Sequence, residues 1–185
     1  MSGPVVSALP IVMEEQPADR MAALFDAHHQ RLYRLARRLT PSADDALDLV
    51  QETFLRAART PGSVPSGADR EEAWLVRVLI NLRRDQWRKA AVRKRHDEPP
   101  PPFHAEPDHG AAVIARATIW RALDLLPPRR RAVVVMHELE GLAISTIASQ
   151  LGISAITARW HLAKGRQDLT RVLTSRQGDT HEDRR

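Results

Sequence analysis

Residues 145–173 read STIASQLGISAITARWHLAKGRQDLTRVL, which is typical of two helices joined by a tight turn. Gly152 stands where a chain leaving a helix can adopt positive φ without a Cβ penalty, and Ser154 suits the N-cap of the helix that follows. In that second helix, small and apolar residues recur at alternating steps of four and three, which predicts one buried stripe. They are Ala158, Leu162, Gly165, Leu169 and Val172. The stretch therefore predicts a helix-turn-helix, a shape that fits the DNA major groove.

The opposite side of this second helix offers hydrogen-bond donors for base edges, cations for phosphates and an indole for a thymine methyl or a sugar. The residues concerned are Thr157, Arg159, Trp160, His161, Lys164 and Arg166. Helix-turn-helix patterns also occur by chance. The alternative interpretation is a basic, solvated helix on an ordinary helical domain.

Composition favours an all-α protein. Aromatic residues make up 4% of the 185 residues, and we find no strand pattern and no internal repeat. A formal charge of +5 and a sequence pI near 10.6 are compatible with a polyanionic partner but do not require one. There is no cysteine, which excludes disulfides and thiolate metal sites. No secretory signal and no apolar run of about 20 residues is present, so we expect a soluble, cytoplasmic protein without membrane contact of its own.

Helical periodicity divides the chain into two small domains. We expect a flexible leader at residues 1–20, a helical domain at 21–96, a flexible, acidic, Pro-rich linker at 97–111, a second helical domain at 112–173 and a frayed tail at 174–185. In the first domain, helices are expected at 21–39, from the N-cap Ser42 onward, and at 69–96, with residues 60–68 as a loop. The core stripe expected for the second of these helices is Leu47, Val50, Phe54 and Ala58.

The third expected helix carries a basic face. Its members are Arg77, Asn81, Arg84 and Arg88, spaced four, three and four apart. Val76, Ile80 and Trp87 lie beside them, and cations next to an apolar strip are the chemistry that single-stranded nucleic acid needs. The equally weighted alternative is that these three apolar residues pack against the first helix while the arginines are solvated.

The second expected helix carries an acidic face beside its core stripe, formed by Asp45, Asp48, Gln51, Glu52 and Leu55. Such a rim around an apolar spot suits a basic protein partner, although a simply solvated face is as common. Catalysis finds little support: His28 and His29 point to different helix faces, and there is no phosphate loop or nucleophile elbow. We therefore expect no metal, no cofactor and no enzyme activity.

Five strings in one order resemble the extracytoplasmic-function (ECF) sigma factors of bacteria. They are DLVQETFLRA (48–57), AWLVRVLINL (73–82), LPPRRRAVVV (126–135), HELEGL (137–142) and the helix-turn-helix. The resemblance implies an all-α fold with two domains, a sigma region 2 bundle and a sigma region 4 helix-turn-helix, that bind core RNA polymerase and promoter DNA and confer promoter recognition. It also implies an anti-sigma protein as a partner.

The resemblance assigns roles to the three faces. Asp48, Gln51 and Glu52 match positions that meet the polymerase, and Arg77, Asn81, Arg84 and Arg88 match the surface that opens the minus-10 element and holds a flipped base. Arg159, Trp160, Ala163 and Lys164 match readers of the minus-35 element. Four residues depart from the common pattern, so the promoter read is expected to be atypical: Trp160, His161, His137 and Ala163. Val76 lacks the aromatic ring common at its position, which concerns the details of base capture and not the role. The competing hypotheses are a stand-alone helix-turn-helix regulator and a nucleic-acid enzyme.

Overall fold

The structure is a computed structural model that describes residues 17–94 and 111–182. Every regular element in those two ranges is helical, as the sequence predicts. The elements are α1 (Pro17–Leu39), α2 (Ala43–Arg59), the 3-10 turn η1 (Pro61–Ser63), α3 (Ala68–Lys94), α4 (Ala111–Asp124), α5 (Pro128–Val134), the π-helical turn η2 (Val135–Leu139), α6 (Ile144–Leu151) and α7 (Ala155–Glu182). The expected linker falls almost wholly outside the described residues, as does most of the expected leader.

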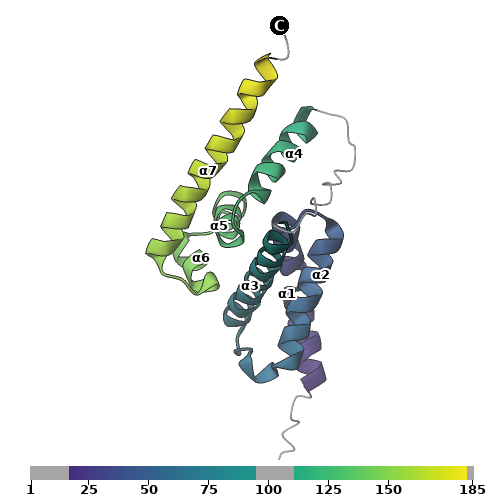
Figure 1. The fold of residues 1–185 in the computed structure, drawn as a ribbon. Coiled ribbons are helices and arrows are strands. Elements are labelled where there is room, and N and C mark those ends of the chain that lie inside the picture. Colours follow the sequence, from purple (N-terminus) through teal and green to yellow (C-terminus); the bar gives the residue numbers. More distant parts are fainter. Residues whose placement is uncertain (1–16, 95–110, 183–185) are drawn as a thin grey trace, which may run out of the picture.

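Helices α1 to α3 form one bundle, and α4 to α7 gather beside it (Figure 1). The buried side chains nevertheless form one continuous cluster that includes Leu32 and Leu35 of α1, Leu79 of α3, Met136 of η2 and Ile147 of α6. Helices α3 and α6 pack directly on each other, and so do α3 and α5. The two bundles therefore share a core.

Local chemistry accounts for several helix ends. Ser42 caps α2, since its Oγ accepts the Asp45 backbone N–H at 3.0 Å, and Asp44 and Asp45 lie at the positive end of the helix dipole. At the far end of α6, Gly152 adopts φ 63° and ψ 42°, the left-handed conformation expected there. Ser154 then caps α7 by accepting the Thr157 backbone N–H at 3.1 Å.

Helix α7 runs past Leu173 to Glu182, and the orientation expected for α2 was wrong. No proline interrupts that stretch, and the Thr170 and Thr174 hydroxyls bond back to helix carbonyls at 3.0 and 2.8 Å. In α2 the buried stripe is Ala46, Leu49, Val50, Thr53, Phe54 and Ala57, whereas Leu47 and Ala58 are exposed.

Candidate nucleic-acid interface

The helix-turn-helix is formed by α6, residues 152–154 and α7. Backbone bonds close the turn, since the Ile153 N–H donates to the Ala148 carbonyl at 3.0 Å and the Gly152 N–H to the Ser149 carbonyl at 3.2 Å. Ala158 and Leu162 are buried on the inner side of α7. Gly165 is buried too, and a Cβ there would come within 2.4 Å of Val134 Cγ2. The predicted stripe thus holds α7 against α5.

The outer side of α7 is open over its first turns. Ile156 is 76% exposed and Trp160 is 55% exposed. Arg159, which lies between them in the sequence, and Ala163, which follows them, are exposed as well. Spacings of three and four residues put these side chains on one helix face. Sequence analysis missed Ile156, although its position four residues before Trp160 was a usable signal.

Arg130 of α5 orients the indole of Trp160. Its guanidinium carbon lies 5.4 Å from the centre of the Trp160 ring, which is within cation–π range. The same guanidinium forms an ion pair with Asp168, which lies eight residues after Trp160 on α7. Arg130 was not among the predicted residues, because nothing in the local sequence distinguishes it from Arg129 and Arg131.

The remaining residues predicted for DNA contact have partners within this part of the molecule. His161 is half-buried and meets Trp160 edge to face, with 5.0 Å between ring centroids. Burial, with Arg130 and Arg129 nearby, lowers the pKa of His161. Lys164 Nζ donates to Gln167 Oε1 at 2.8 Å, and Arg166 pairs with Glu138 at 2.6 Å. The charge of this helix face is therefore supplied by its arginines and Lys164.

The basic face of α3 is only partly open. Arg88 is exposed, while Asn81 and Arg84 are half-buried. Arg77 donates from Nη2 to the Ser149 carbonyl of α6 at 3.2 Å. Val76 and Ile80 are 0% and 2% exposed and belong to the core. Of the three apolar residues named with this face, Val76 and Ile80 are therefore buried, whereas Trp87 is 37% exposed.

The acidic face of α2 keeps the character expected from the sequence. Asp48 and Gln51 are exposed and Glu52 is half-buried. Leu55, on the same stripe, is 48% exposed, and Leu47 is 40% exposed. Exposed leucines surrounded by carboxylates form a surface that a partner with apolar and basic groups can cover.

The imidazoles of α1 are used in packing. His28 is 5% exposed, and its Nε2 lies 3.4 Å from Glu71 Oε2; His29 stacks on Phe25 with centroids 4.4 Å apart. Among the described residues, no group of three or more His, Asp or Glu side chains could hold a metal ion. Within residues 17–94 and 111–182, no helix has the length and apolar content to cross a bilayer.

Comparison with known proteins agrees with this architecture. Residues 24–93 match the family model described as Sigma-70 region 2, and residues 116–169 match Sigma-70, region 4. The chain is 36% identical over 161 residues to ECF RNA polymerase sigma factor SigE of Mycolicibacterium smegmatis, with 83% of this chain and 61% of that protein covered. It is 34% identical over 151 residues to ECF RNA polymerase sigma factor SigM of Mycobacterium tuberculosis, with 81% and 75% covered.

A similar fold occurs in the sigma factor RpoE of Bartonella quintana, solved in complex with the anti-sigma factor NepR. The TM-score is 0.57 at 21% sequence identity, and the match covers 86% of this chain and 98% of that one. The chain spans about three fifths of the length of the SigE relative and three quarters of the SigM relative.

Proposed function

Because this chain belongs to the ECF family of RNA polymerase sigma factors, we propose that it directs core RNA polymerase to promoters by binding, without catalysis or cofactor. The observation that carries the proposal is the open face of α7, in which Arg159, Trp160 and Ala163 line the outer side of a helix-turn-helix. A helix of this kind inserts its first turns into the major groove. We assign this face to the minus-35 element.

Within that assignment, the residues divide by chemistry. Arg159 and Lys164 donate to base edges or phosphates, and Trp160 and Ala163 make apolar contacts. The hydroxyl of Thr157, at the start of the helix, forms a hydrogen bond with the DNA. His161 and Arg166 act at the margin of the contact, since His161 meets Trp160 edge to face and Arg166 is paired with Glu138. Sigma region 4 is proposed to cover residues 112–173.

The basic face of α3 is assigned to the minus-10 element. Arg77, Arg84 and Arg88 supply phosphate contacts, and the Asn81 amide can recognise an extruded base through its donor and acceptor atoms. Unstacking a base costs a few kcal/mol, which contacts with the base and polymerase contacts with the open strands can offset. Sigma region 2 is proposed to cover residues 21–96, with 97–111 as the linker that lets both regions bind one promoter.

The acidic face of α2 is assigned to core RNA polymerase. Asp48, Gln51 and Glu52 precede the exposed Leu55 on one side of α2, so a basic and apolar element of the polymerase fits this surface. The structural relative's complex with an anti-sigma factor supports a regulator of that kind as a second partner. We place the protein in the cytoplasm, where RNA polymerase works.

Reconstituted transcription tests this function. Purified core RNA polymerase is combined with the chain and fragmented genomic DNA of the source bacterium, and the transcript 5′ ends are mapped. We expect starts at a defined set of sites that share two spaced sequence elements and that vanish when the chain is omitted. Sequence-specific DNA binding by a dimer of the chain, with no initiation in the presence of core enzyme, would support a stand-alone regulator instead.

A further inference from the structure

The start of α7 exposes an apolar strip between two cations. Ile156 is 76% exposed and Trp160 is 55% exposed, and Ala163 is exposed as well. At about 100° per residue, these three side chains fall within roughly 60° of the helix surface, with Arg159 on one side and Lys164 on the other. A recognition helix in the major groove turns the centre of its face to the base edges and its flanks to the two strands. The part of this helix that meets the base edges is therefore apolar.

One chemical group in the major groove suits such a surface. The base edges there present hydrogen-bond donors and acceptors, and the alkyl group among them is the C5 methyl of thymine. The deoxyriboses lie along the strands, where they face the flanks of the helix. Ile156 has no polar atom on its side chain, and Trp160 offers only its indole N–H. A thymine methyl is therefore the group that both side chains can remove from water with a gain in free energy.

The indole of Trp160 is already held in place in the free chain. The guanidinium carbon of Arg130 lies 5.4 Å from the centre of the Trp160 ring, and the imidazole of His161 meets the same ring edge to face. A surface tryptophan without such neighbours samples several rotamers, and ordering it on binding costs free energy. The contacts with Arg130 and His161 reduce that cost, because they favour one orientation of the indole.

Arg130 is itself fixed by two features of α7. Its Nη1 donates to Asp168 Oδ2, and the two side chains of this ion pair are only 16% and 21% exposed. A Cβ at Gly165 would lie 3.2 Å from Arg130 Cγ, so the glycine leaves room for the arginine to reach Trp160. The Arg130 Nε is buried and has no hydrogen-bond partner among the described residues. Asp168 is therefore the contact that anchors the guanidinium.

We propose that this chain reads the minus-35 element through thymine methyl groups, with Trp160 as the specificity-determining residue and Arg130 as the residue that positions its indole. Ile156 extends the apolar surface by one helical turn. Arg159 and Lys164 bind at the two sides, where the phosphates and the outer base edges lie. The assignment to the minus-35 element rests on the proposed function, whereas the methyl contact itself can be tested without polymerase.

Replacement of thymine by deoxyuridine tests the contact, because it removes the methyl group and leaves the hydrogen-bonding atoms unchanged. The full chain first enriches a duplex from a random-sequence pool at about 50 mM KCl, where phosphate contacts are strong. Each thymine of that duplex is then replaced in turn, and fluorescence anisotropy measures the Kd. We expect one or two thymines at which uracil raises the Kd of the wild type by about fourfold, the effect of one buried methyl group.

Trp160→Ala should remove this discrimination. Its Kd for the thymine duplex should rise at least to the wild-type value for the uracil duplex, and its Kd values for the two duplexes should be equal. Ile156→Ala should reduce the discrimination without abolishing it. The matched control is Ile119→Ala, which removes an exposed apolar side chain from α4 and should leave both Kd values unchanged.

Arg130→Met keeps the apolar stem and removes the cation beside the indole. It should lower the uracil-to-thymine ratio of Kd values, because an indole with several orientations meets the methyl group less often. Asp168→Asn should act in the same direction, and Arg130→Lys should restore most of the ratio, since an ammonium also interacts with an aromatic face. Arg129→Met removes the neighbouring charge of α5 and is the matched control, with the wild-type ratio expected. Circular dichroism of each variant establishes that its helices are formed.

Equal binding of the wild type to the thymine duplex and to every uracil duplex would overturn methyl readout, even if the chain initiates transcription. A pool without any enriched sequence would overturn it as well. Discrimination that persists in Trp160→Ala would assign the contact to another residue, and equal weakening of both duplexes by Arg130→Met would make Arg130 a phosphate contact. A chain that discriminates as expected but fails to initiate with core RNA polymerase would overturn only the proposed function.

Discussion

At the scale of single residues, some side chains of α7 point outward toward DNA, and others support them. Arg159 is exposed, and Lys164 is half-buried with a single amide partner. Arg159→Ala and Lys164→Ala should each weaken binding to a minus-35 duplex by about tenfold, since a good base contact contributes about 1–3 kcal/mol. Fluorescence anisotropy with the mapped promoter measures this. Arg171→Ala, at an exposed position later on α7, is the control and should bind as the wild type does.

The His161 imidazole predicts a pH dependence of stability. Burial lowers its pKa in the folded protein, so below about pH 6.5 the unfolded chain binds more protons than the folded one, and acidification favours unfolding. The wild type should lose thermal stability between about pH 7.5 and about pH 5.5. His161→Gln should lose less over that interval. An equal loss in both proteins would show that His161 titrates normally.

Sequence reasoning identified most of these residues but not their surroundings. Arg159 and Trp160 follow from helical periodicity, which fixes the face on which a side chain lies. The contact of Arg130 with Trp160 spans 30 positions of the chain, and periodicity carries no information on such pairs. The same is true of His161, whose pKa is lowered first by burial and then by the arginines of a different helix.

At the scale of elements, α2 shows where periodicity misled. Leu47 fits an apolar stripe with Val50 and Phe54, yet it is 40% exposed because the bundle buries the Ala46 side of the helix. The misassigned leucine therefore adds to the partner surface around Leu55. Leu55→Ala should weaken binding to core RNA polymerase by about tenfold or more, if the residue lies near the centre of that interface.

Stability distinguishes that role from a structural one. Because Leu55 is 48% exposed, its truncation should leave the thermal midpoint nearly unchanged. Leu125→Ala, at a leucine that is 63% exposed and far from α2 in sequence, is the matched control and should bind core enzyme normally. Surface plasmon resonance with immobilised core RNA polymerase gives both affinities. Wild-type affinity for Leu55→Ala would remove α2 from the polymerase interface.

The packing of α5 on α7 depends on a residue without a side chain. A Cβ at Gly165 would lie 2.4 Å from Val134 Cγ2 and 3.2 Å from Arg130 Cγ. Gly165→Ala should destabilise the protein by about 1–3 kcal/mol through overpacking, measured by chemical denaturation. Gly62→Ala is the control, because a Cβ there meets nothing within 4 Å. Equal stability of the two variants would mean that α5 and α7 separate easily.

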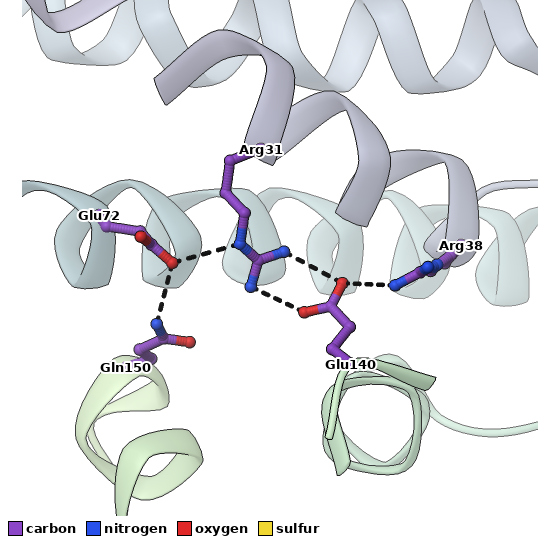
Figure 2. A network of polar contacts seen from close by, with 5 residues as sticks. All are labelled: Arg31, Arg38, Glu72, Glu140 and Gln150. Carbon is purple, nitrogen blue, oxygen red and sulfur yellow. Dashed lines mark hydrogen bonds and ion pairs between the residues drawn. The ribbon is translucent and has the colours of Figure 1, made fainter. Parts of the chain in front are cut away.

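At the scale of the whole molecule, the sequence predicted two domains but gave no indication that they touch. The residues that join them are polar, widely separated and unremarkable locally (Figure 2): Arg31 and Glu140 are 109 positions apart. Arg31 and Arg38 of α1 both pair with the Glu140 carboxylate. The sequence left Val76 and Ile80 open between base capture and packing, and both are buried in the core cluster that the two bundles share. A periodic pattern describes each helix face but not which of two faces a neighbouring domain will cover.

A shared core makes the unfolding of the two domains interdependent. Leu79 of region 2 and Ile147 of region 4 belong to one buried cluster, so at about 50 mM KCl we expect a single calorimetric transition with equal calorimetric and van't Hoff enthalpies. Glu140→Gln, or about 500 mM KCl with the wild type, should split it into two, because separated domains melt independently. Glu138→Gln is the control and should keep one transition, because its partner Arg166 belongs to the same bundle. If the wild type already shows two transitions at low salt, then the bundles are not thermally coupled through this interface, and each region unfolds independently.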